Sequence, residues 1–185
     1  FNQVYDVVSP CFHSDTSAIL SNAILLSGPR GVGKCATVDN LASKLGVSVM
    51  TVNYRTKIES TRDVACVKAC EKLKEYILLA KKSAPCILHI RRFHAKPSTD
   101  GQVQNKDGAM NIALTVEKAI QQCARESVTS NGNNCISRTK SVFIIFSCSD
   151  VDDVDSCVRG KISHEVVMSQ ASTEGRCNML QTVHV

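Results

Sequence analysis

The chain has 185 residues, of which 43 % are apolar and 21 % charged, and its 22 basic and 17 acidic residues give a net charge of +5. This composition is that of an average soluble globular domain and excludes a disordered or fibrous chain. No apolar run approaches the roughly 18 residues of a membrane-spanning helix; the strongest covers residues 142–146. The length suits one domain, or one domain plus part of a second. The start lacks an initiator Met and a signal peptide, so we expect a fragment of a longer protein.

The first half of the chain alternates predicted strands with predicted helices. Residues 1–22 are expected to be irregular. The apolar run Ala23–Ser27 predicts a buried strand. Helical spacing over residues 33–45 predicts a helix, which Gly46 ends. The β-branched, alternating residues 47–52 predict a second strand.

The second half continues the same alternation. A helix is predicted over residues 61–83, with Val64, Val67 and Ile77 on its apolar face, and a strand over 86–90. Residues 109–125 return to helical period, between polar loops at 96–107 and 126–141. A fourth strand is predicted over 142–146 and a fifth over 165–168. Strands that alternate with helices imply an α/β fold with a mainly parallel five-stranded sheet flanked by helices.

Ten cysteines are more than such a domain usually contains. They form no Cys-x-x-Cys pair and no cluster with the five histidines, so no zinc or other metal site is expected. A secreted disulfide framework is normally built on a shorter chain. Several cysteines replace small apolar residues in periodic segments, and we therefore expect reduced, buried thiols in a cytosolic protein. His89, in an apolar strand, is expected to be a packed core residue, and His164 and Glu165 are expected to be structural.

A glycine-rich segment joins the first predicted strand to the first predicted helix. It consists of Gly28, Pro29, Arg30, Gly31, Val32, Gly33, Lys34 and Cys35. The pattern Gly-x-x-x-x-Gly-Lys between a strand and a helix is typical of a phosphate loop, whose backbone N–H groups and lysine bind nucleotide phosphates. We therefore predict a P-loop domain that binds ATP or ADP, against the alternative of a simple glycine-rich turn. The mild positive charge permits such a ligand and does not indicate nucleic acid.

The residue after the loop lysine departs from the usual pattern. A Ser or Thr hydroxyl at this position normally ligates Mg²⁺, which prefers oxygen ligands. Here the residue is Cys35, and its sulfur suits softer metals. Thr37 lies two positions further along the helix and is a poor substitute. Mg²⁺ is therefore weakly supported, and a redox-sensitive Cys35 thiol is a minor alternative.

The predicted strand at residues 86–90 leads into Arg91 and Arg92. P-loop ATPases place an acid that supports Mg²⁺ at the end of such a strand, and many that hydrolyse ATP follow it with a glutamate that activates water. No other Asp or Glu lies between Glu75 and Asp100. We therefore expect nucleotide binding with slow or no hydrolysis. The two arginines are either solvated strand-end charges or counter-charges for the phosphates.

The order of these motifs resembles the ATPases associated with diverse cellular activities, the AAA superfamily. The match runs through residues 24–34, 85–93 and 141–165. On this resemblance Arg91 and Arg92 take the acid positions that follow the third strand, and Ser149 takes the sensor-one position. Arg159 and Lys161 fall near the arginine fingers that reach a neighbouring subunit, although Lys161 lacks the guanidinium fork.

Within the superfamily the chain resembles the first, degenerate ATPase domain of the peroxin-6 type. The resemblance rests on Cys-Ile-Leu-His-Ile-Arg-Arg-Phe at 86–93, Ile-Ser-His-Glu-Val-Val-Met at 162–168 and the segment at 174–180. It implies a subunit of a heterohexameric ring, in which it alternates with a peroxin-1-type subunit. The ring lies in the cytoplasm at the peroxisomal membrane and extracts the import receptor. After the irregular segment expected at 1–22, it also implies an ATPase core at 23–170 and the start of a truncated helical lid at 171–185.

Two other functions stay open. An active P-loop ATPase or kinase of another family needs a carboxylate near Mg²⁺, and only Asp150, Asp152, Asp153 or Asp155 could supply it. The other possibility is an interaction module whose phosphate loop is vestigial.

Overall fold

The structure is a computed structural model, and it describes residues 2–12, 22–54, 62–94, 106–125 and 142–170. Its five strands are β1 (Ala23–Ser27), β2 (Ser48–Asn53), β3 (Cys86–Arg91), β4 (Val142–Ser147) and β5 (His164–Val167). They form one sheet in the order β2-β3-β4-β1-β5, and all neighbouring strands are parallel. The α/β fold with a five-stranded parallel sheet is confirmed.

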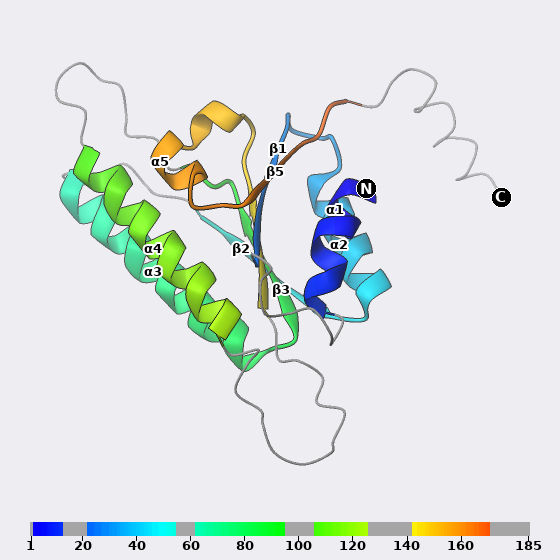
Figure 1. Ribbon diagram of the computed structural model, residues 1–185. Helices are drawn as coiled ribbons and strands as arrows, with labels where there is room; N and C mark the ends of the chain where they lie inside the picture. Colours follow the sequence, from blue (N-terminus) through cyan, green and yellow to red (C-terminus); the bar gives the residue numbers. More distant parts are fainter. Residues whose placement is uncertain (1, 13–21, 55–61, 95–105, 126–141, 171–185) are drawn as a thin grey trace, which may run out of the picture.

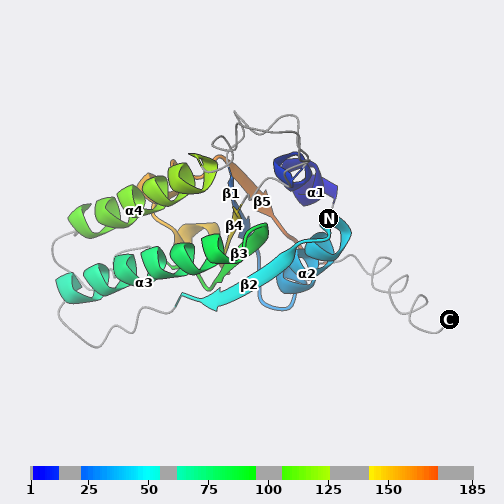
Figure 2. The ribbon, with the colours of Figure 1, turned by 90° about the horizontal axis from the view of Figure 1, so that it is seen from below.

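Helices cover both faces of this sheet (Figures 1 and 2). On one face, α3 (Arg62–Lys82) and α4 (Lys106–Arg125) lie side by side, and on the other lie α1 (Asn2–Val8) and α2 (Lys34–Leu45). Because both faces are covered, the central strands β1, β3 and β4 are continuous apolar runs that are almost fully buried. The edge strands β2 and β5 are largely exposed.

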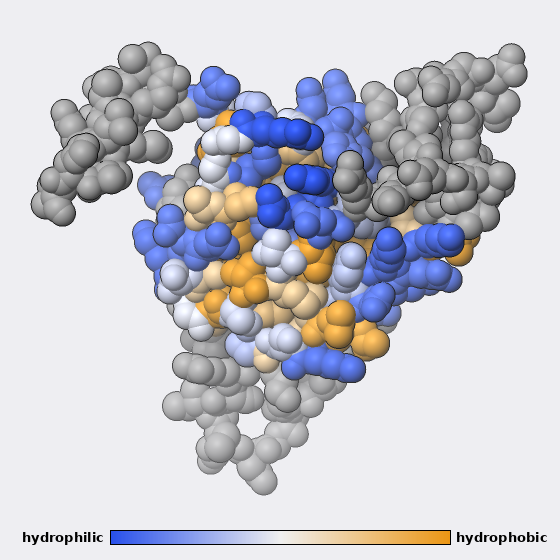
Figure 3. Space-filling view, turned by 180° about the vertical axis from the view of Figure 1, so that it is seen from behind, coloured by the Kyte–Doolittle hydropathy of each residue, from blue (hydrophilic) through white to orange (hydrophobic). Residues whose placement is uncertain are grey.

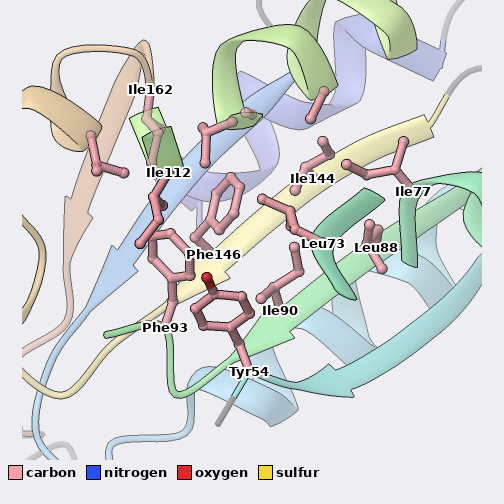
Figure 4. Close-up of a cluster of buried hydrophobic side chains, with 14 of the residues drawn as sticks. Tyr54, Leu73, Ile77, Leu88, Ile90, Phe93, Ile112, Ile144, Phe146 and Ile162 are labelled. Carbon is pink, nitrogen blue, oxygen red and sulfur yellow. The ribbon is translucent and has the colours of Figure 1, made fainter. Parts of the chain in front are cut away.

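Two apolar cores lie on the two faces of the sheet. The α1 and α2 side packs Val8, Leu41 and Phe143 with neighbouring apolar residues. The α3 and α4 side holds the larger cluster, part of which Figure 4 shows. In that cluster the ring of Phe93 lies between those of Tyr54 and Phe146, with centroids 5.0 and 4.6 Å away.

The boundaries of most predicted elements are close to those observed. The helix at α2 ends at Gly46, whose φ of 65° lets its N–H donate to the carbonyls of Ala42 and Ser43. Helix α4 begins at Lys106, three residues before its predicted start. The seven cysteines whose side chains the structure describes are all free thiols, five of them buried, as expected.

Two predictions about these elements are wrong. Residues 2–12 are not irregular: α1 is followed by a 3₁₀ turn, η1 (Ser9–Phe12), and Val4, Val8 and Cys11 are buried against the sheet. Val67 does not lie on the buried face of α3 and is 56 % exposed. Ile77 is buried as predicted, and α3 also buries Ala69, Leu73 and Ala80. The predicted lid at 171–185, the loop at 126–141 and residues 13–21 lie outside the described part of the chain.

Candidate nucleotide-binding site

The glycine-rich segment connects β1 directly to α2 at the carboxyl edge of the sheet. Gly33 is the N-cap of α2 in the left-handed conformation, with φ 92°, and no side chain caps the helix. The first backbone N–H groups of α2 are thus left to a ligand, and the helix dipole favours a negative one. Gly28, with φ 150°, lies so close to β5 that a Cβ there would overlap the carbonyl oxygen of Met168. The segment requires glycine at both positions.

Lys34 is the first residue of α2 and folds back over the loop. Its Nζ donates hydrogen bonds to the carbonyl oxygens of Gly28 and of Pro29, the latter at 2.9 Å. Burial lowers the pKa of Lys34 from its usual value, while the nearby thiols of Cys148 and Cys35 act in the opposite direction. The ammonium is therefore held by two carbonyls that a phosphate group can replace.

A cavity of about 370 Å³ lies beside the loop, among the ends of β3 and β4 and the start of α2. We call it the cation pocket, and its lining residues are Arg30, Gly31, Gly33, Lys34, Cys35, Ala36, Arg91, Arg92, Ser147, Cys148 and Ser149. Figure 3, seen from the side opposite to Figure 1, shows strongly hydrophilic residues in the upper centre of the molecule and apolar residues gathered below them. The carboxyl ends of the strands lie in this upper part (Figure 1).

The structure brings together most of the residues singled out from the sequence. Five of the eight loop residues line the cation pocket, whereas Gly28, Pro29 and Val32 are not among its lining residues. The pocket also includes Ser149, Arg91 and Arg92.

The backbone holds the two arginines in place. The Arg91 carbonyl accepts a hydrogen bond of 2.8 Å from the N–H of Tyr54, and the N–H of Phe93 donates one of 2.9 Å to the carbonyl of Ser147. Between these anchors, Arg92 has a φ of 54°, uncommon for a residue other than glycine. This turn sends Phe93 into the core and leaves Arg92 at the pocket.

A buried polar pair lies next to the pocket. The Nε2 atom of His89 is 3.0 Å from the hydroxyl of Ser147, which lines the pocket. Burial, and secondly the positive charge of Arg91, lower the pKa of His89 from 6.5 to about 4, so the imidazole is neutral at neutral pH. His89 is a packed core residue, as expected.

The sequence reasoning did not find Ser147 and Cys148. The alternation of strand β4 was an available signal for Ser147. Phe143 and Ile145 face α2, and the side chain two residues further on faces the same way.

The aspartates that follow β4 are engaged in local structure. Asp150 accepts a hydrogen bond from the N–H of Asp152, and Asp153 accepts one from the N–H of Asp150, which closes a capping box on the 3₁₀ turn η2 (Val151–Asp153). Asp155 caps α5 (Ser156–Arg159) through the N–H of Cys157. None of these aspartates lines the cation pocket.

Arg159 and Lys161, the predicted finger residues, form ion pairs within the chain. Arg159 Nη2 donates to Glu165 Oε2 at 3.0 Å, and Lys161 Nζ lies 3.0 Å from Glu117 Oε2 of α4. Neither residue lines the cation pocket. The Glu165 carboxylate therefore has a partner within the chain, and the structural role expected of His164 and Glu165 stays a prediction.

In the part of the chain that the structure describes, no three His, Cys, Asp or Glu residues are grouped so that they could hold a metal ion. No helix of these residues is long and apolar enough to cross a membrane.

A parallel sheet in which a central strand leads through a glycine-rich loop and lysine into a helix defines the class of P-loop nucleotide-binding proteins. The family described as "ATPase family associated with various cellular activities (AAA)" matches residues 24–170. The chain therefore belongs to the AAA family, and membership in this family implies nucleotide binding.

Comparison with known proteins confirms the resemblance to the peroxin-6 type. The chain is 24 % identical over 185 residues to Peroxisomal ATPase PEX6 of Dictyostelium discoideum, a match that covers 98 % of this chain and 14 % of the relative. It is 25 % identical over 188 residues to Peroxisomal ATPase PEX6 of Arabidopsis thaliana, covering 92 % of this chain and 19 % of the relative. The chain thus spans less than a fifth of the length of these two relatives.

A solved structure shows the same fold. The crystal structure of the FIGL-1 AAA domain in complex with ADP superposes with a TM-score of 0.66 at 12 % identity, over 98 % of this chain and 56 % of that one.

Proposed function

We propose that the chain is a nucleotide-binding AAA domain that hydrolyses ATP slowly or not at all. The observation that carries this proposal is the composition of the cation pocket, which joins a phosphate loop and its Lys34 to Arg91 and Arg92 in place of two acids. The loop supplies backbone donors and a lysine for the phosphates of ATP or ADP. The strand end supplies no general base.

The missing acids account for the slow hydrolysis. Loss of a general base typically lowers a rate by about 10² to 10⁴, and loss of the carboxylate that supports Mg²⁺ adds to this. Asp150, Asp153 and Asp155 accept hydrogen bonds from the backbone of η2 and α5, which argues against their serving as substitutes. Ser149, at the pocket, is left to contact the nucleotide as a sensor-one residue.

The similarity to two proteins named Peroxisomal ATPase PEX6 supports a cellular role. In this proposal the domain builds a heterohexameric ring with a peroxin-1-type subunit at the cytoplasmic face of the peroxisomal membrane. The ring extracts the import receptor for matrix protein import, and a different ATPase domain supplies most of the energy. Arg159 and Lys161 then lie near the interface with the neighbouring subunit.

The first experiment measures ATP binding and ATP turnover by the same preparation. We expect saturable binding of a labelled ATP analogue, negligible phosphate release, and loss of binding in Lys34→Ala. The matched control is Lys72→Ala, which removes an exposed lysine of α3 outside the pocket and leaves binding unchanged. Brisk hydrolysis that Lys34→Ala abolishes would show an active P-loop enzyme. Absence of binding at millimolar analogue would show a vestigial loop.

The ring role is tested separately. The chain is mixed with the first ATPase domain of a peroxin-1-type protein, and the mass of the complex is measured by analytical ultracentrifugation with and without nucleotide. A nucleotide-dependent hetero-oligomer is expected, and two species that sediment independently would contradict the role.

A further inference from the structure

The cation pocket has an unusual balance of charge for a site that meets a metal–nucleotide complex. Four of its lining side chains, those of Arg30, Lys34, Arg91 and Arg92, are cationic, and none is a carboxylate. The carboxylates of Asp150 and Asp153, beside the pocket, are held in the capping box of η2. A ligand of this pocket therefore meets positive charge from the loop and from the strand ends.

The donor atoms of the pocket do not fit Mg²⁺. This cation requires oxygen ligands in near-octahedral geometry and is usually held in proteins by one or two carboxylates. The lining side chains offer only the hydroxyls of Ser147 and Ser149 as oxygen donors, and Ser147 is already paired with His89. Cys35 presents sulfur at the position where a hydroxyl normally contacts the ion. Positive charges nearby repel a further cation.

Arg91 and Arg92, at the end of β3, are positioned to supply the positive charge that a metal ion would otherwise bring to the phosphates. Ile87 and His89 of β3 lie on the α2 side of the sheet, and strand alternation places Arg91 on that same side, toward the phosphate loop. The hydrogen bonds of Tyr54 and Phe93 fix the backbone on either side of Arg92. The positive charge of Arg91 is felt inside the protein, because it contributes to the low pKa of His89.

On the basis of the function proposed above, we propose that the cation pocket binds nucleotide as the metal-free polyphosphate anion, with Arg91 and Arg92 in place of Mg²⁺. Guanidinium groups donate paired hydrogen bonds to phosphate oxygens, so they neutralise charge and also orient the group. A triphosphate carries about four negative charges at neutral pH. Bound Mg²⁺ would cancel part of this charge and weaken the attraction.

The test compares binding in EDTA with binding in excess Mg²⁺, by isothermal titration calorimetry on the unmodified chain. The probes are ATP, ADP and inorganic tripolyphosphate, the last of which reports on the phosphate site without the base. In EDTA we expect ATP and tripolyphosphate to bind, and we expect Mg²⁺ to weaken ATP binding by about tenfold, the loss of roughly one charge-assisted interaction. Raising the salt concentration weakens binding in EDTA, because exposed charges are screened.

A triple variant tests which residues set this preference. Arg91→Asp combined with Arg92→Glu restores the two acids, and adding Cys35→Thr restores the hydroxyl. We expect this triple variant to bind ATP more tightly with Mg²⁺ than in EDTA, the reverse of the unmodified chain. The matched control is Lys72→Glu with Lys74→Glu on the exposed side of α3, which changes the net charge as much as the arginine pair does. It keeps the preference for metal-free ATP.

The outcomes separate this inference from the function on which it rests. ATP binding that is tighter in EDTA than in Mg²⁺, with this order reversed in the triple variant, supports metal-free binding. Binding that is equal in the two conditions, or tighter in Mg²⁺, overturns the inference and leaves a nucleotide-binding domain in place. No binding in either condition overturns both. A triple variant that unfolds, as judged by circular dichroism, is replaced by Arg91→Gln, which should weaken ATP binding in EDTA more than in Mg²⁺; an equal loss in both overturns the inference.

Discussion

His89 and Ser147, 58 residues apart in the chain, form a buried pair in which Nε2 and Oγ lie 3.0 Å apart. The pair joins β3 to β4 beside the cation pocket, which Ser147 lines. His89 occupies a position in an otherwise apolar strand and is 1 % exposed. A neutral imidazole brings no charge into the apolar surroundings and still provides a hydrogen-bond partner for the Ser147 hydroxyl.

We predict that this pair makes stability depend on pH. The pKa of His89 is about 4 in the folded chain and 6.5 otherwise, so the unfolded chain binds the proton first as the pH falls. Stability from this group is complete above about pH 6.5 and is lost as the pH falls towards about 4, by an amount on the order of 2 to 3 kcal/mol. Urea unfolding at several pH values measures this loss.

One variant tests whether His89 is the group that titrates. His89→Phe removes the titrating group and should flatten the stability profile between about pH 6.5 and 4 relative to the unmodified chain. An unchanged profile in His89→Phe would contradict the assignment.

Phe93, which directly follows Arg91 and Arg92, is predicted to anchor this segment of the chain in the apolar core and to stabilise the fold. Its ring is fully buried between Tyr54 and Phe146 (Figure 4). Phe93→Ala should lower the free energy of unfolding by about 3 to 5 kcal/mol, through lost contacts and a cavity. Leu79→Ala, at a 43 % exposed position of α3, should change it by about 0.5 kcal/mol or less. Chemical denaturation of both variants makes the comparison, and equal losses would contradict a supporting role.

The part of the fold set by local signals was predictable from the sequence. The strand at Ala23–Ser27, the phosphate loop and the helix ended by Gly46 carry short-range signals: an apolar run, glycines before a lysine, and helical spacing. The parallel sheet followed from strands that alternate with helices. The position of the two arginines was predictable as well, since Arg91 and Arg92 lie at the end of a buried strand.

The features that were predicted wrongly or missed depend on tertiary contacts. Val4, Val8 and Cys11 have helical spacing, but so short a helix is marginal alone and forms because it packs on the sheet. Val67 satisfies the helical period of α3 and is nonetheless exposed, because the sheet and α4 cover a different stripe of the helix. The pairing of His89 with Ser147 requires the register between β3 and β4, which no local pattern contains.

We predict that stability requires glycine at position 28, because the backbone at the end of β5 lies close to it. Gly28→Ala would place a Cβ against the carbonyl of Met168, at a φ that side chains rarely adopt. The expected loss of stability is about 2 to 4 kcal/mol, with weaker nucleotide binding because the loop shifts. Gly160→Ala is the control: its φ is −61° and its nearest new contact is 3.4 Å away, so its stability should stay within about 1 kcal/mol. Thermal unfolding distinguishes the two, and a stable Gly28→Ala would contradict the close approach.

Arg159 and Lys161 are predicted to leave the isolated chain almost unaffected when replaced. Their ion pairs with Glu165 and Glu117 are partly exposed, and such pairs contribute about 0 to 1 kcal/mol. Arg159 also has a buried Nε without a hydrogen-bond partner, which lowers stability. Replacing Arg159 removes this unfavourable contribution. Arg159→Ala and Lys161→Ala should therefore keep both stability and ATP affinity, measured by denaturation and titration on the isolated chain. Since neither residue lines the cation pocket, a marked fall in ATP affinity would mean that the residue acts on its own subunit's nucleotide. An effect that emerges only in the assembled ring is the behaviour expected of a residue that acts on its neighbour.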